Sequence, residues 1–271
     1  MTNPDFDLDS QLQSIGDIDE TSQPTTRTWS GRLSANWSIG SVPNGGYSAG
    51  VLLRGLLAHT GCETALSLTT HYYRPTIANA EVEIRTDVLR RGRSTTHADG
   101  VLIQDGKVRL RTSGVFGATP TGPTRLPAAP REIPPPEECV ERDPQAQGLD
   151  MSLMQSLEVR LHPEHPLPID GSTARVEGWI RFRDDRPNDA LALCLFADAF
   201  PPAILSAVPD AGWVPTIEMT SHTRAAAAPG WIRGRITTSN VSGGYLVEDV
   251  RLWDSTDTLV VDARQLALLR T

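Results

Sequence analysis

Lysine is nearly absent from this chain. Lys107 is the only lysine among 25 basic residues, and arginine supplies the rest. The arginines are scattered, and the formal net charge of the 271 residues is -8. No segment offers a basic stripe to phosphate groups, so we do not expect a nucleic-acid-binding protein.

Cysteine is also scarce. Cys62, Cys139 and Cys194 are odd in number and far apart in the sequence. Their positions show neither the spacing of metal ligands nor a paired disulfide framework. We therefore expect reduced thiols, no metal or other cofactor, and a cytoplasmic location.

The chain has no long apolar run. Its acidic N-terminal segment lacks the pattern of a signal peptide. The most apolar segment, residues 44–59, is too short to cross a bilayer, so we expect no membrane span. The composition, with 39% apolar and 21% charged residues, is typical of a soluble globular protein.

Residues 44–59 nevertheless predict the central element of the fold. Leucine, valine and alanine leave no broad polar face, and a helix of this kind must be buried on nearly all sides. Residues 64–74 alternate between two faces, as a strand does. A long helix enclosed by a curved antiparallel sheet satisfies both patterns.

Further strands are expected on either side of this helix. The two residues Asp105-Gly106 are a strong hairpin signal between the last two strands. Residues 1–25 are rich in Asp, Ser and Thr and predict a flexible acidic arm. The first folded unit is therefore expected at residues 26–117. Its strands are predicted at 26–37, 64–74, 81–89, 94–104 and 107–116.

Prolines dominate residues 118–150. Such a stretch pairs poorly in a sheet and cannot form a long helix. We interpret it as an extended crossover linker between two halves.

The second half repeats the pattern of the first. A strand at 174–183 precedes an apolar helix at 189–199, and four strands follow at 213–224, 231–238, 245–253 and 258–268. The run Leu68-Thr69-Thr70-His71 is echoed by Met219-Thr220-Ser221-His222. We therefore predict a duplicated α+β domain, with residues 151–271 as the second unit and the two sheets paired as in a homodimer. We also expect the protein to form a homo-oligomer.

Short motifs in both halves carry a family resemblance. In order and spacing they resemble bacterial acyl-CoA thioesterase II, the TesB-like double hot-dog family, over about residues 27–270. The motifs are Pro43-Asn44-Gly45-Gly46, Tyr72-Tyr73-Arg74-Pro75, Asp105-Gly106, Phe196-Ala197-Asp198, Pro215-Thr216-Ile217-Glu218 and Arg264-Gln265.

The resemblance implies a double hot-dog fold and an enzyme of lipid metabolism that hydrolyses fatty acyl-CoA. It implies a catalytic trio of Asp198, Thr216 and Gln265, whose side chains hold the attacking water. It also leads us to expect substrate contacts at Gly45, Gly46 and Tyr72.

The residue types suit this chemistry. Thioester hydrolysis needs a proton acceptor, a positioned water and donors to the developing oxyanion. A helix C-terminus and apolar neighbours should both raise the pKa of Asp198. Backbone N–H groups at the start of the helix 44–59 could bind the oxyanion. Gln265 lies in an apolar strand and therefore needs a polar partner.

The two halves are predicted to be unequal. The helix 44–59 contains no Asp or Glu, and aligning the last strands of the halves through Val108 and Leu259 places Gly114 opposite Gln265. We therefore expect one active site per chain, in the second half.

Two alternatives stay open at this point. The run Gly46-Tyr47-Ser48-Ala49-Gly50, with Asp198 and His222 downstream, fits the order of an α/β-hydrolase triad. A nucleophile elbow needs an apolar strand directly before it, however, and residues 38–44 do not form that pattern. A non-catalytic acyl-CoA-binding protein of the hot-dog fold is the second alternative.

Overall fold

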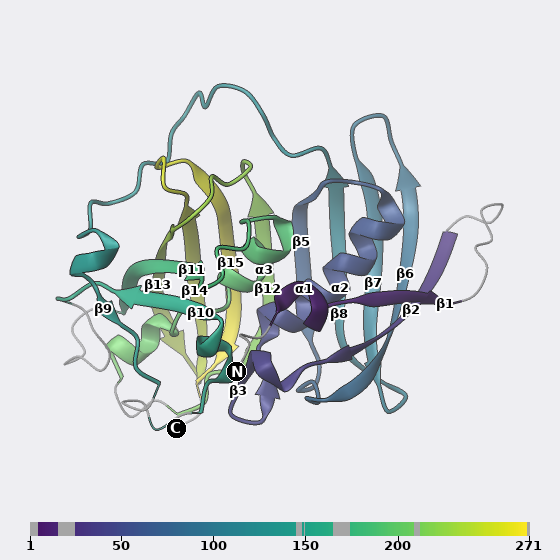
Figure 1. Cartoon of the computed structure of the whole chain (residues 1–271), viewed down its shortest axis with the longest axis horizontal. Coiled ribbons are helices and arrows are strands. Elements are labelled where there is room, and N and C mark those ends of the chain that lie inside the picture. The colour runs from purple at the N-terminus through teal and green to yellow at the C-terminus, as the bar shows by residue number, and fades with distance from the viewer. Residues whose placement is uncertain are drawn as a thin grey trace.

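The chain folds around one very wide sheet. The computed structural model describes residues 5–15, 25–144, 148, 150–164, 174–208 and 212–269. Within these residues a 13-stranded sheet runs in the order β1-β2-β6-β7-β8-β5-β12-β15-β14-β13-β11-β10-β9. The sheet extends across the whole molecule in Figure 1.

The first half supplies six strands of this sheet. They are β1 (Leu12–Ile15), β2 (Thr25–Leu33), β5 (Thr64–Tyr72), β6 (Ala80–Arg91), β7 (Thr96–Gln104) and β8 (Lys107–Gly117). β7 and β8 are joined at Asp105 and Gly106, which both have positive φ as a tight hairpin requires. The short strands β3 (Ser38–Ile39) and β4 (Val42–Pro43) pair separately and lead into the first long helix.

The second half repeats this order in mirror fashion. Its strands are β9 (Val140–Glu141), β10 (Leu157–Leu161), β11 (Arg175–Phe182), β12 (Thr216–Thr223), β13 (Ile232–Ser242), β14 (Tyr245–Trp253) and β15 (Leu259–Leu268). The halves join where β5 pairs antiparallel with β12, and the hydroxyls of Thr69 and Thr220 hydrogen-bond across this seam at 2.9 Å. The architecture is a double hot-dog of the α+β class, as the sequence predicted.

Each half encloses a helix. In α2 (Gly45–Thr60) the Asn44 side chain caps the N-terminus by accepting from the Tyr47 N–H, and Gly61 ends the helix in the left-handed region with φ 68°. In α3 (Ala190–Phe196) the Asp189 side chain accepts from the Ala192 N–H. α2 and α3 pack together inside the curved sheet (Figure 1), and their apolar residues belong to one continuous core.

The prediction of a flexible arm is wrong for residues 5–15. They form the short helix α1 (Phe6–Asp9) and the strand β1, which pairs with β2. Phe6 is only 1% exposed and packs against Trp37 and against Phe182 of the second half, with ring centroids 5.0 and 5.5 Å apart. Burial of this aromatic ring holds the segment down. Residues 1–4 and 16–24 lie outside the described part.

The proline-rich segment differs in extent from the predicted linker. Residues 118–135 contain no helix or strand and run along the molecule from β8 to the second half (Figure 1). Residues 136–142 already belong to the second half, because they contain the 3-10 turn η2 (Pro136–Glu138) and β9, which pairs with β10. Residues 145–147 and 149 of the predicted linker lie outside the described part.

Three further 3-10 turns lie in the segments that connect the helices and strands. They are η1 (Ala35–Trp37), η4 (Ser152–Gln155) and η5 (Ala203–Ser206). The Ser152 hydroxyl accepts from the Ser38 N–H at 3.1 Å, so this contact ties the start of the second half to the loop that precedes α2.

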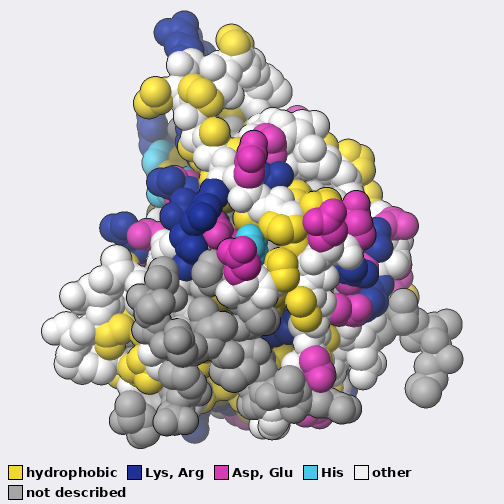
Figure 2. All heavy atoms as spheres, turned by 90° about the vertical axis from the view of Figure 1, so that its left-hand side faces the viewer, with side chains coloured by type: hydrophobic (Ala, Val, Ile, Leu, Met, Phe, Trp, Pro, Cys, Tyr) yellow, Lys and Arg dark blue, Asp and Glu magenta, His cyan; other side chains and the backbone are white. Residues whose placement is uncertain are grey.

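Charges of both signs are interspersed on the face of the second half shown in Figure 2. Within the second half, Arg160 and Arg181 both pair with Glu158, with N–O distances of 2.6 and 2.8 Å. No helix in the described ranges is long and apolar enough to cross a bilayer.

Candidate active site

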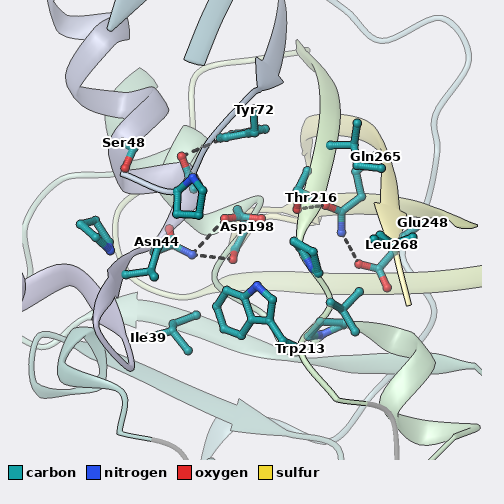
Figure 3. A pocket seen from close by; sticks show the side chains of 18 of the residues that line it. Ile39, Asn44, Ser48, Tyr72, Asp198, Trp213, Thr216, Glu248, Gln265 and Leu268 are labelled. Carbon is teal, nitrogen blue, oxygen red and sulfur yellow. Dashed lines mark hydrogen bonds between the residues drawn. The ribbon is translucent and has the colours of Figure 1, made fainter. Parts of the chain in front are cut away.

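A cavity of about 710 Å³ lies between the two halves. Its polar wall comes from the start of α2, the end of β5, the segment after α3 and the strands β12, β14 and β15 (Figure 3). Its apolar wall includes Ile39, Val42, Met151, Phe200, Leu205, Trp213, Val214, Ile236, Val250 and Leu268. The cavity can therefore take a ligand with an apolar chain and one polar group.

Asp198 lies on this wall just beyond α3. Its backbone N–H donates to Leu195 at 3.1 Å, and its carboxylate crosses to the other half. There Oδ2 accepts from the Asn44 Nδ2 at 2.9 Å and from the Gly46 N–H at 2.8 Å. Burial raises the pKa of Asp198 to about 6, although the bonds from Gly46, Asn44 and Gly45 lower it.

The surroundings of Asp198 differ from the prediction in one respect. The sequence suggested that a helix C-terminus disfavours its anion. The carboxylate instead accepts hydrogen bonds at the N-terminus of α2, where a helix dipole stabilises negative charge. Burial is what raises the pKa.

Gly45 and Gly46 lie so close to Asp198 that no side chain would fit at either position. A Cβ at Gly45 would stand 2.9 Å from Asp198 Oδ2, and one at Gly46 would stand 2.9 Å from Asp198 Cβ. The Gly46 N–H is bonded to Asp198, and the next N–H, that of Tyr47, is bonded to Asn44. Both N–H groups, which we expected to be open to an oxyanion, thus have partners within the protein, and the Gly46 N–H holds the acid.

Tyr72 also borders the cavity. Its hydroxyl donates to the Gly45 carbonyl at 3.3 Å. Burial, reinforced by the neighbouring Asp198, raises the pKa of the Tyr72 phenol well above its ordinary value, so the phenol stays protonated. Gly45 and Tyr72 line the cavity, and their contact with a substrate stays a prediction. Gly46 does not line it and donates to Asp198 instead.

Thr216 and Gln265 form a second polar group on the same wall. The Thr216 hydroxyl donates to Gln265 Oε1 at 2.6 Å. Gln265 Nε2 in turn donates to Glu248 Oε1 at 2.6 Å. Figure 3 shows the chain of Thr216, Gln265 and Glu248 facing the same space as Asp198. The structure therefore brings the predicted trio together around one cavity.

Glu248 and Asn44 are polar site residues that the sequence analysis missed. Glu248 is 2% exposed and also accepts from the Ala203 N–H at 2.6 Å and from the Thr238 hydroxyl at 3.1 Å. Burial raises the pKa of Glu248 to about 7, against the effect of these bonds. The signal was present, since the alternation of β14 places Glu248 on the same face as Leu246 and Val250.

Ser48 does not form a hydrolase triad. It lies inside α2, and its hydroxyl shares a hydrogen bond of 3.0 Å with Thr76. The proposed histidine partner, His222, is exposed on β12 opposite Asp262. In the described residues before Ser48, β3 and β4 have two residues each and lie outside the large sheet, and Ser48 lies within α2 rather than at a strand-to-helix turn. These described residues form no nucleophile elbow, so the α/β-hydrolase alternative is wrong.

The first half carries apolar residues at the positions equivalent to Gln265 and Thr216. Gly114 pairs with Leu68 and Ala98, just as Gln265 pairs with Met219 and Glu248. A Cβ at Gly114 would stand 2.7 Å from the ring of Phe116, which is fully buried. By the same register Ala65 stands where the second half has Thr216.

Among the residues that the structure describes, no group of three or more His, Cys, Asp or Glu side chains is placed to hold a metal ion.

Comparisons with known proteins agree with this architecture. A protein of Mycobacterium tuberculosis without an assigned function is 29% identical over 275 residues, which cover 91% of this chain and 92% of that protein. A solved structure from Thermobifida fusca, provisionally named thioesterase II, is 30% identical with a TM-score of 0.85 and covers 98% of this chain and 97% of its own. A hot-dog protein from Alicyclobacillus acidocaldarius has a TM-score of 0.83 at 24% identity, with 98% of both chains covered.

Family assignment comes from both halves of the sequence. Residues 33–117 match the acyl-CoA thioesterase N-terminal domain, and residues 136–269 match the acyl-CoA thioesterase C-terminal domain. The second match begins at the proline turn that precedes β9, where the structure also places the start of the second half. The chain belongs to the acyl-CoA thioesterase family.

Proposed function

We propose that the protein hydrolyses fatty acyl-CoA to the free acid and CoA. The observation that carries this proposal is the position of the buried acid Asp198 on the same cavity wall as Thr216 and Gln265. A carboxyl group whose pKa is about 6 is ionised at neutral pH and is a better base than a surface aspartate.

The residues divide the work as follows. A water in the cavity donates one hydrogen to the Asp198 carboxylate and is held by Thr216 and Gln265. Its oxygen attacks the thioester carbonyl carbon as Asp198 takes the proton. When the tetrahedral intermediate collapses, the C–S bond breaks and the proton passes from Asp198 to the departing thiolate. No covalent enzyme intermediate is required.

Asn44 and the start of α2 keep Asp198 in place. They donate to its carboxylate, which has further lone pairs to receive a proton. The apolar wall accommodates the acyl chain. Self-association and a cytoplasmic location remain proposals based on the sequence.

Release of free thiol from short, medium and long acyl-CoAs tests the proposal. We expect hydrolysis without added metal or nucleotide. Asp198→Asn, prepared in the same way, is the control for contaminating hydrolases. If acyl-CoA binds but no chain length is hydrolysed, the protein is a non-catalytic acyl-CoA-binding protein.

A further inference from the structure

Glu248 is a buried acid for which the proposed reaction gives no direct task. It lies on β14, and the groups that shift its pKa in the described structure are Ala203, Gln265, Thr238 and Asp198. None of these is a cation. Taking a carboxylate out of water without a counter-ion is costly, so the three hydrogen-bond donors committed to Glu248, from Ala203, Thr238 and Gln265, require an explanation.

The carboxylate determines which way the Gln265 amide faces. In its ionised form, which prevails above its pKa of about 7, Glu248 only accepts hydrogen bonds, so Gln265 must turn its Nε2 toward it. Its Oε1 then faces Thr216, and the Thr216 hydroxyl must donate to it. The lone pairs of the Thr216 oxygen are thereby left to accept from a donor in the cavity.

Thr238, Glu248 and Gln265 form a row of polar residues that the hot-dog fold itself does not require. In the second half the row crosses three neighbouring strands, as Thr238 pairs with Glu248 and Glu248 pairs with Gln265. The equivalent row of the first half, read from the same strand register, consists of Val88, Ala98 and Gly114. Apolar residues thus satisfy the fold at the same three places, which indicates that the row serves the cavity.

We infer that Glu248 is a positioning residue that fixes the direction of the hydrogen bonds from Thr216 to Gln265 and thereby orients the attacking water. The inference rests on the proposed hydrolysis. Glu248 acts through Gln265 and need not contact the reacting atoms.

Glu248→Gln tests this with almost no change in shape. The new amide must keep an oxygen toward the Ala203 N–H, and its NH2 group then faces the NH2 group of Gln265. Gln265 has to rotate, and its NH2 group displaces the Thr216 hydroxyl hydrogen from its acceptor. We expect kcat to fall about tenfold or more, with KM within about threefold of the wild type.

Glu177→Gln is the matched control. Glu177 is a buried acid of the second half, 3% exposed, that pairs with Arg175 and Arg235. It is not part of the cavity wall. Its replacement should leave kcat unchanged, which separates the loss of any buried charge from the loss of Glu248.

A double-mutant cycle shows whether the effect passes through Gln265. In a Gln265→Ala background, Glu248→Gln should lower kcat by less than about twofold, because its target is already absent. If the kcat losses of the two single variants multiply in full in the double variant, the inference is overturned.

The orientation of the amide can also be followed without turnover. The side-chain NH2 resonances of Gln265, assigned by their loss in Gln265→Ala, should move in Glu248→Gln and stay in place in Glu177→Gln. Resonances that do not move refute the inference even if the protein hydrolyses no thioester. If the wild type hydrolyses acyl-CoA and Glu248→Gln is fully active, the inference is refuted and the proposed function still stands.

A second variant covers the case in which Glu248→Gln does not fold. Glu248→Asp keeps the charge but is one methylene shorter, so it loses the 2.6 Å bond to Gln265. It should also lower kcat about tenfold with little change in KM. Wild-type turnover in this variant would contradict the positioning role.

Discussion

Asp198→Asn isolates the charge of the proposed base. The asparagine Oδ1 can accept the bonds that Asn44 and Gly46 donate to Asp198, so the local structure should be kept. An amide cannot take a proton from water. We expect kcat to fall about 10²- to 10⁴-fold, the usual contribution of a general base, with little change in KM.

The same substitution should stabilise the protein at high pH. Burial raises the pKa of Asp198 from 3.8 to about 6, and this corresponds to roughly 3 kcal/mol against the ionised form. Because the folded pKa lies above the unfolded one, the favourable contribution of the protonated acid is complete below about pH 4 and is lost as the pH rises through about 6. Asparagine has no such dependence.

The measurement is the free energy of unfolding by urea at about pH 4 and about pH 8 for both proteins, beside thiol release. The difference between variant and wild type should shift by roughly 3 kcal/mol toward the variant at the higher pH. Asp189→Asn, at an exposed helix cap away from the cavity, should keep its kcat. An equal stability difference at both pH values, or wild-type turnover in Asp198→Asn, would refute the reasoning.

Three further predictions follow from the same geometry. Gly46→Ala should lower both the melting temperature and kcat, at a cost of about 1–3 kcal/mol, because its Cβ would stand 2.9 Å from Asp198; Gly50→Ala, whose nearest neighbours are 3.8 Å away, should be tolerated. Ser48→Ala should keep most activity, and a serine-directed fluorophosphonate should not label Ser48; stoichiometric labelling there would contradict this. Calorimetric titration with a tight, slowly released product analogue should find one site per chain, and a fragment of residues 150–271 should be inactive; two equivalent sites would disprove the inequality of the halves.

Much of the fold could be predicted from the sequence, because each half shows clear strand alternation, an apolar helix and recognisable turn residues. The helix 44–59 agrees with α2 within one residue at each end, since Asn44 and Gly61 mark its ends chemically. The flexible-arm prediction is wrong for residues 5–15 because Phe6 is a single aromatic residue in an acidic context. What fixes it is a cluster of rings from distant segments, which no local pattern reveals.

The site was predictable in its residues and less so in its connections. Asp198, Thr216 and Gln265 were found by resemblance, and they line one cavity. The sequence did not reveal the part that Gly46 plays, because the contact that occupies its N–H comes from a residue 152 positions away. Glu248 was passed over although its strand alternation placed it inward.

The bond between Asp198 and the start of α2 has a consequence for the life of the chain. The acid belongs to the second half and its donors to the first, so neither half alone assembles the site. If Asp198 is the base, we expect a nascent or partly unfolded chain not to hydrolyse thioesters. Activity should appear only when the two halves have docked. Thioester hydrolysis would then report completed folding, and partly folded protein would leave cellular thioesters intact.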